Sequence, residues 1–207
     1  MDFTNALINV AILWMLTTPH EFAHAWVATK LGDDTPELEG RVTLQPLAHI
    51  DWVGTTLLPF ISSLFGNGAL IGWGKPVNTN VSKLKWGYNG LLLVALAGPV
   101  MNLIFALVLI VLTRLLRMSV PDVASIALRA AQLSVYLAVF NLLPVPPLDG
   151  SKLLIALRVP PFIYIELARF GFVLLILAFY YTPLGSWINN TSLQITAAMF
   201  QLTLVLT

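Results

Sequence analysis

Long apolar stretches alternate with short polar ones along most of the chain. Stretches long enough for a membrane-spanning helix, which needs about 20 predominantly apolar residues, occupy residues 5–28, 88–113, 123–143, 159–181 and 188–206. A weaker apolar stretch at 52–71 contains Pro59 and several glycines, which fit a short span, a re-entrant hairpin or an interfacial segment. The pattern predicts an all-α polytopic membrane protein with five or six transmembrane segments.

Two polar stretches, residues 32–51 and 74–87, interrupt the first half of the chain. Within them, residues 40–44 and 75–80 carry β-branched residues in partial alternation, which is typical of short strands. We therefore expect a small β element at the cytoplasmic mouth, whose free edge would suit an extended peptide. The sequence has no long internal repeat and no stretch long enough for an appended soluble domain, so we expect residues 1–207 to form a single membrane-embedded domain.

Composition agrees with a chain surrounded by lipid. Hydrophobic residues make up 57% of the 207 residues and charged residues only 10%, whereas about 25% of a soluble domain is charged. The mean hydropathy is +0.83. A net charge of +1 gives no reason to expect a nucleic-acid partner. The chain has no cysteine, which excludes disulfides and thiolate chemistry.

Basic residues predict the orientation, because cytoplasmic loops are rich in lysine and arginine. Five of them lie between the first apolar stretch and residue 88, and two more follow residue 149: Lys30, Arg41, Lys75, Lys83, Lys85, Lys152 and Arg158. We expect this side of the protein to be cytoplasmic. Arg114, Arg117 and the N-terminus would then lie on the opposite side.

A candidate metal site lies near the end of the first apolar stretch, where residues 20–24 read His-Glu-Phe-Ala-His. Two imidazoles four residues apart project from one face of a helix and can share a metal. Glu21 follows His20 by about 100° around the helix, within reach of a metal-bound water. Ionisable groups inside a spanning segment are costly and usually functional, so we favour a metal site over two buried, hydrogen-bonded histidines.

A catalytic zinc site typically has three protein ligands and an open position, so a third ligand must come from elsewhere in the chain. The candidates in apolar surroundings are His49, Asp51, Asp122, Asp149 and Glu166. Asp149 has the most informative context, because three prolines between residues 141 and 150 end a hydrophobic helix and force extended backbone. Broken backbone at membrane depth is tolerated only where protein or a watery cavity satisfies it. The alternative is an ordinary turn with Asp-Gly at its tip.

Three motifs run through most of the chain in a fixed order: His20-Glu21-x-x-His24, then Gly98-Pro99-x-x-Asn102, then Asn141-x-x-Pro144 through Leu148-Asp149-Gly150. Together they resemble the site-2 protease family of intramembrane metalloproteases. Residues 40–51 look like the compact bacterial and archaeal branch, without a PDZ or CBS domain. The resemblance suggests an integral membrane protein of the prokaryotic inner or plasma membrane, with its active site toward the cytoplasmic side.

The resemblance implies an HExxH zinc metalloendopeptidase with one Zn²⁺ per chain, held by His20, His24 and Asp149, and with Glu21 as the catalytic base. Asn102 and Asn141 would offer amide groups to an unwound substrate, although hydrogen bonding between helices explains either asparagine equally well. The expected substrates are transmembrane proteins or peptides, cleaved in regulated intramembrane proteolysis or in the clearance of signal-peptide remnants. Membrane lipid is the other expected partner, and a homodimer is left open.

Three other interpretations use the same residues. An ion or metal transporter would need the ligands but has no use for Glu21, and it would usually show internal repeats. A proteolytically silent scaffold of the same fold would not need the intact base. A prenyl-protein type of HExxH protease would want a downstream glutamate as third ligand, which Glu166 could supply. His49 could be a transient fourth ligand or a gate, but an interfacial loop histidine is the favoured interpretation.

Overall fold

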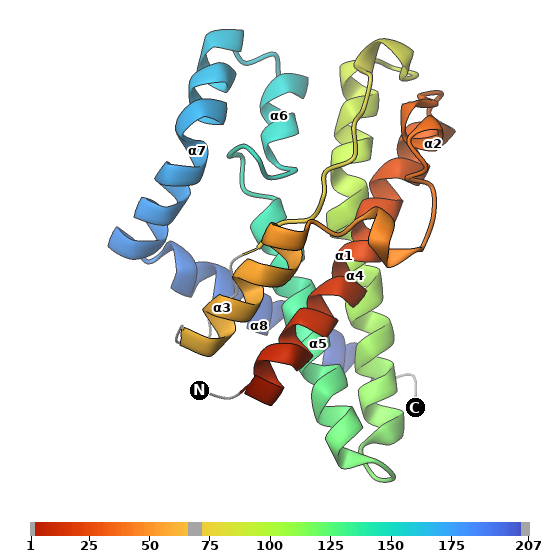
Figure 1. Cartoon of the computed structure of the whole chain (residues 1–207), viewed down its shortest axis with the longest axis vertical. Helices are drawn as coiled ribbons and strands as arrows, with labels where there is room; N and C mark the ends of the chain where they lie inside the picture. Colours follow the sequence, from red (N-terminus) through yellow and green to blue (C-terminus); the bar gives the residue numbers. More distant parts are fainter. Residues whose placement is uncertain (1–2, 66–71, 204–207) are drawn as a thin grey trace. The chain divides into compact units, whose positions relative to one another are not determined.

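The computed structural model describes residues 3–65 and 72–203, and this part of the chain consists of helices joined by turns and irregular loops (Figure 1). The chain divides into two compact units, Met1–Gly90 and Leu91–Thr207. A single domain over residues 1–207 stays a prediction.

The first unit is built on one long helix, α1 (Phe3–Lys30). Shorter elements follow it: α2 (Thr35–Leu38), the 3₁₀ turn η1 (Pro46–Ala48), the π-helical η2 (Trp52–Leu57), α3 (Leu58–Phe65) and the 3₁₀ turn η3 (Val81–Lys83). Both η2 and α3 pack along α1 (Figure 1). Asn9 of α1 donates from Nδ2 to Ser63 Oγ at 2.6 Å, and Trp14 Nε1 donates to Thr56 Oγ1 at 3.1 Å. These side-chain bonds fix how the apolar faces of the helices meet.

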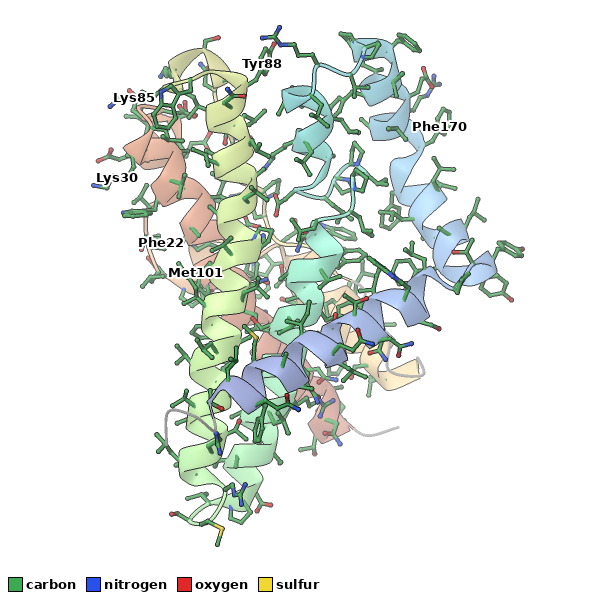
Figure 2. The ribbon with its side chains drawn as sticks, turned by 180° about the vertical axis from the view of Figure 1, so that it is seen from behind. Phe22, Lys30, Lys85, Tyr88, Met101 and Phe170 are labelled. Carbon is green, nitrogen blue, oxygen red and sulfur yellow. The ribbon has the colours of Figure 1, made fainter. Side chains whose placement is uncertain are left out.

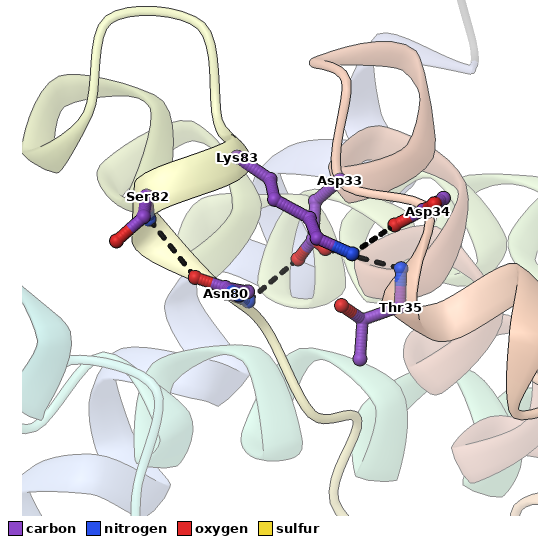
Figure 3. A network of polar contacts seen from close by, with 6 residues as sticks. All are labelled: Asp33, Asp34, Thr35, Asn80, Ser82 and Lys83. Atoms are coloured by element: carbon purple, nitrogen blue, oxygen red, sulfur yellow. Dashed lines mark hydrogen bonds and ion pairs between the residues drawn. The ribbon is translucent and has the colours of Figure 1, made fainter.

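Asp33 fastens the loop after α1 to the segment that precedes α4 (Figure 3). Its carboxylate is fully buried and accepts hydrogen bonds from the backbone N–H groups of Thr35, at 3.1 Å, and Asn80, at 2.6 Å. The neighbouring Asp34 instead makes an exposed ion pair with Lys83 at 2.5 Å. The buried carboxylate therefore joins two segments that lie far apart in the sequence.

Helix α4 (Tyr88–Leu116) leads into the second unit. Four helices follow it in the described part of that unit: α5 (Pro121–Asn141), α6 (Ser151–Ala156), α7 (Pro161–Tyr181) and α8 (Leu184–Leu202). The helices α5 and α8 pack against each other, and α5 buries small side chains such as Ala124, Ala127 and Ala131. Small residues allow helices to approach closely where lipid gives no hydrophobic driving force. Ser134 Oγ of α5 donates to the carbonyl of Asn102 in α4 at 2.8 Å.

Helix α7 makes few contacts within the protein. Only 11% of its most apolar 18 residues are buried inside the protein, and Phe170 points outward from the helix (Figure 2). An apolar helix with so little protein around it is typical of a segment that faces lipid.

The prediction of five or six membrane spans was wrong for the described part of the chain. Three helices there, α4, α5 and α7, are both long and apolar enough to cross a bilayer. The apolar stretches at 5–28 and 188–206 do form α1 and α8, but polar residues such as Asn9, His20 and Asn189 dilute their apolar character. Helix Trp52–Leu64 has 13 residues and is therefore about 20 Å long, too short for a bilayer core of about 30 Å.

The predicted β element was also wrong: residues 40–44 and 75–80 are irregular, and no strand occurs within residues 3–65 or 72–203. A buried side chain takes the place of a ladder of backbone hydrogen bonds. The Arg41 guanidinium donates to the carbonyls of Ala48, at 2.5 Å, and of Lys75. Strand propensity in these segments is overridden where side chains bind the backbone: Arg41 binds the carbonyl of Lys75, and His49 binds the carbonyl of Thr43.

Replacement of Asp33 tests whether the buried carboxylate holds the first unit together. We expect Asp33→Ala to lower the free energy of unfolding by about 2–4 kcal/mol, because two buried N–H groups lose a charged acceptor. Denaturant unfolding in detergent measures this. Asp34→Ala is the matched control and should change stability little, since exposed ion pairs contribute little. Equal effects of the two substitutions would contradict the assignment.

Candidate metal centre

The two histidines of the His-Glu-Phe-Ala-His sequence face each other on α1. His20 and His24 are four residues apart in the helix, so their side chains lie on the same face. Their Nε2 atoms are 3.1 Å apart, and the ring planes are inclined by 83°. The side chains are 6% and 3% exposed, respectively. The imidazoles therefore converge as their helical spacing predicts, while their role as metal ligands stays a prediction.

The distance between the two nitrogens fits a shared metal ion. Two nitrogens that bind one tetrahedral zinc at about 2.0–2.1 Å are about 3.3 Å apart, close to the 3.1 Å between these Nε2 atoms. The helix sets this distance before any ion binds, because both ligands belong to one rigid element. The donor set, two imidazoles in an apolar helix, suits zinc better than the oxygen-preferring cations.

Glu21 is buried beside a glycine of the segment that follows α3. The residue is 8% exposed. A Cβ atom added at Gly74 would lie 2.8 Å from Glu21 Oε1 and 2.7 Å from Thr17 Cγ2. The backbone at Gly74 therefore passes directly along the carboxylate. Sequence analysis did not predict this approach, because residues 21 and 74 are far apart and no local pattern connects them.

His49 lies in a loop, as predicted, but it is fully buried. Its Nε2 lies 2.7 Å from the carbonyl oxygen of Thr43, so this nitrogen carries the hydrogen and donates it. Among the residues that the structure describes, Nδ1 has no hydrogen-bond partner. Burial lowers the pKa of His49, and the charge of Arg41 acts in the same direction, while the Thr43 bond and Glu21 oppose it. The ring is therefore held in its neutral form.

Asp149 lies in the proline-rich turn between α5 and α6, in the second unit. Its side chain is 12% exposed and accepts from Lys152 Nζ at 3.2 Å. The turn is closed by the Gly150 N–H, which donates to the carbonyl of Asn141 at 2.7 Å. The predicted ligands thus come from both units of the chain. The role of Asp149 as third ligand stays a prediction.

The two candidate substrate-binding asparagines differ in their surroundings. Asn102 is 1% exposed, and its Oδ1 has no hydrogen-bond partner in the described part of the chain. Asn141 donates from Nδ2 to the carbonyl of Leu137, one turn earlier in its own helix, at 2.9 Å. Asn102 therefore keeps an unused acceptor, whereas part of the Asn141 amide is occupied locally. Binding of substrate by either residue stays a prediction.

The sequence is similar to a known protein family and to proteins of two bacteria. Residues 8–127 and 116–178 match the model of peptidase family M50. YwhC of Bacillus subtilis is 36% identical over 203 residues, which cover 89% of this chain and 88% of YwhC. Rip2 of Mycobacterium tuberculosis is 32% identical over 155 residues, which cover 72% of this chain and 57% of Rip2. Both relatives carry provisional names that assign them to the zinc metalloproteases. No solved structure matches the chain.

The buried neutral ring of His49 predicts a pH dependence of stability. Its pKa is lowered in the folded state, so the unfolded chain takes up this proton more readily. The contribution is complete above the unfolded pKa of about 6.5 and is lost as the pH falls toward the folded pKa. We expect unfolding in detergent to shift more between pH 7.5 and 5 in metal-free wild type than in metal-free His49→Gln. Parallel shifts in the two proteins would contradict a buried neutral His49.

Proposed function

Because the chain belongs to peptidase family M50, we propose that it is an intramembrane zinc metalloendopeptidase of the HExxH type. It is an integral membrane protein, and within residues 3–65 and 72–203 three helices are long and apolar enough to cross a bilayer. The observation that carries the proposal is the pair of buried imidazoles whose Nε2 atoms are 3.1 Å apart, with a buried glutamate directly after the first.

One Zn²⁺ per chain would be held by His20 and His24 of α1 together with Asp149. Two imidazoles and a carboxylate leave a fourth position open for the reacting groups, as catalytic zinc sites require. When bound, zinc would act as a Lewis acid on the scissile carbonyl and make water more acidic. The helical spacing of the two histidines supports the first two ligands. The carboxylate chemistry of Asp149 and its place in a broken-helix turn support the third.

Glu21 would act as general base and then as general acid. Its carboxylate accepts a proton from the attacking water and passes it to the nitrogen of the leaving amine. Burial in α1 and the close approach of Gly74 leave the carboxylate little freedom to turn away. A fixed orientation matters because proton transfer requires the carboxylate within hydrogen-bond reach of the water.

The substrates would be transmembrane proteins or peptides, as in regulated intramembrane proteolysis or the clearance of signal-peptide remnants. A helix must unwind before its carbonyl can be attacked, and each unpaired backbone group costs several kcal/mol in lipid. Asn102 and Asn141 would compensate by hydrogen bonding to the unwound backbone. The unpartnered, buried Oδ1 of Asn102 supports this role better than the locally bonded amide of Asn141.

The basic residues around the candidate site support a cytoplasmic orientation. In the first unit, Lys30 ends α1, and Lys75 and Lys85 lie between α1 and α4; Lys152 and Arg158 follow Asp149 in the second unit. Cytoplasmic loops are the ones enriched in such residues. The matched relatives belong to bacteria, which supports a location in the prokaryotic inner or plasma membrane with the active site toward the cytoplasm.

Replacement of the base tests the proposed function directly. We expect Glu21→Gln to retain zinc and to lose turnover by about 10²–10⁴-fold or more, the usual contribution of a general base. The assay measures cleavage of a panel of single-span substrates by detergent-purified protein, with zinc per chain determined on the same samples. Full cleavage by Glu21→Gln would exclude Glu21 as base. Zinc in wild type with no cleavage of any panel member would count against the protease proposal.

Replacement of the third ligand tests the composition of the metal site. We expect Asp149→Ala to lower zinc affinity by at least about tenfold, measured by competition with a chromophoric chelator. Asp122→Ala removes an exposed carboxylate from the first turn of α5 and serves as the control. Equal zinc affinity in Asp149→Ala and wild type would exclude Asp149 as a ligand.

A further inference from the structure

The segment Trp73–Lys75 is the part of the first unit that lies against the carboxylate of Glu21. Gly74 provides the contact, since an added Cβ there would lie 2.8 Å from Oε1. The position of this backbone therefore decides how much room the carboxylate has. What holds the segment in place also determines the orientation of the proposed base.

Hydrogen bonds to residues 49–55 hold the segment from one side. The N–H of Trp73 donates to the carbonyl of Gly54 at 3.1 Å, and Thr55 Oγ1 donates to the carbonyl of Trp73 at 2.8 Å. The N–H of Lys75 donates to the carbonyl of His49 at 2.9 Å. The backbone on both sides of Gly74 is thus anchored.

Arg41 completes this anchorage from a buried position. The residue is 3% exposed. Its Nη1 donates to the carbonyl of Ala48 at 2.5 Å, and its Nη2 donates to the carbonyl of Lys75. One planar guanidinium therefore joins the loop that contains His49 to the residue that follows Gly74. A lysine would not reproduce this pair of bonds, because its three N–H donors radiate from one nitrogen, whereas the guanidinium presents donors from two nitrogens in one plane.

A buried guanidinium is a costly way to join two loops. Removing such a charge from water costs several kcal/mol unless opposite charge and hydrogen bonds compensate. Burial lowers the pKa of Arg41, while the negative charges of Glu21 and Glu39 raise it again. Glu21 is thus close enough to offset part of the cost, which links Arg41 electrostatically to the carboxylate whose neighbour it anchors.

We propose that Arg41 is a positioning residue for Glu21: by binding the carbonyl of Lys75 it keeps the backbone of Gly74 against the carboxylate, which then holds one orientation. The proposal rests on the proposed function, since it assigns Arg41 to the base of that reaction. An arginine with a purely structural role would contribute to stability but would not control the orientation of Glu21. Turnover and the local position of Trp73 separate the two roles.

The test compares Arg41→Gln and Arg41→Lys with wild type. Lys83→Gln is the control, because Lys83 is exposed in η3, outside the segment Trp73–Lys75, and pairs with Asp34. Each protein is assayed for kcat and KM on a cleaved single-span substrate and for zinc per chain. In addition, ¹⁹F NMR of 5-fluorotryptophan-labelled protein resolves the environment of Trp73 among the six tryptophans, with its resonance assigned through Trp73→Phe.

We expect Arg41→Gln to lower kcat by about 10–100-fold, the usual effect of removing a residue that orients a catalytic group. KM should stay within about twofold, zinc should remain near one per chain, and only the Trp73 resonance should move. Arg41→Lys should fall between Arg41→Gln and wild type, and Lys83→Gln should match wild type.

Wild-type kcat in Arg41→Gln would overturn the proposal, as would loss of zinc or broadening of all tryptophan resonances, since these indicate a structural role. An unmoved Trp73 resonance would overturn it as well. That measurement needs no substrate, so it tests the anchorage by Arg41 even if wild type cleaves nothing and the proposed function itself fails.

Discussion

Burial of charged groups within a largely apolar chain is the constraint on which the first unit depends. Glu21, Asp33 and Arg41 are each at most 8% exposed, and an unpaired buried charge would cost several kcal/mol. Each charge is met by backbone groups or by opposite charge. The loops after α1 take their irregular course because their carbonyls and N–H groups serve Arg41 and Asp33. The catalytic candidates are thus embedded in a network that determines the local backbone.

The features that depend on short-range spacing could be predicted from the sequence. The convergence of His20 and His24 follows from the helical repeat, and the long helices lie close to the apolar stretches that predicted them. The number of spans could not be predicted this way. Apolar runs in α1 and α8 are interrupted by polar residues whose burial inside the protein, as for Asn9 and Ser192, no local pattern reveals.

The features that depend on contacts between distant residues could not be predicted. The residues expected as strands carry the right side chains, but the carbonyls of Lys75 and Thr43 are bound by the side chains of Arg41 and His49 rather than by a second strand. The approach of Gly74 to Glu21 and the burial of His49 arise in the same way. The family motif did identify Asn102 as a polar residue in apolar surroundings, and its unpartnered Oδ1 is the structural counterpart of that signal.

Helix α7 connects the surrounding lipid to the turn that carries Asp149. Only 11% of its most apolar 18 residues are buried, so most of the helix is open to lipid, and a mismatch between its length and the bilayer thickness would act on it. Gly171 of α7 lies against the carbonyl of Pro146, where an added Cβ would come within 2.5 Å of the oxygen. A change of membrane thickness that tilted α7 would therefore displace Gly171 relative to this turn. Lipid thickness would then be a physical variable that reaches to within three residues of Asp149.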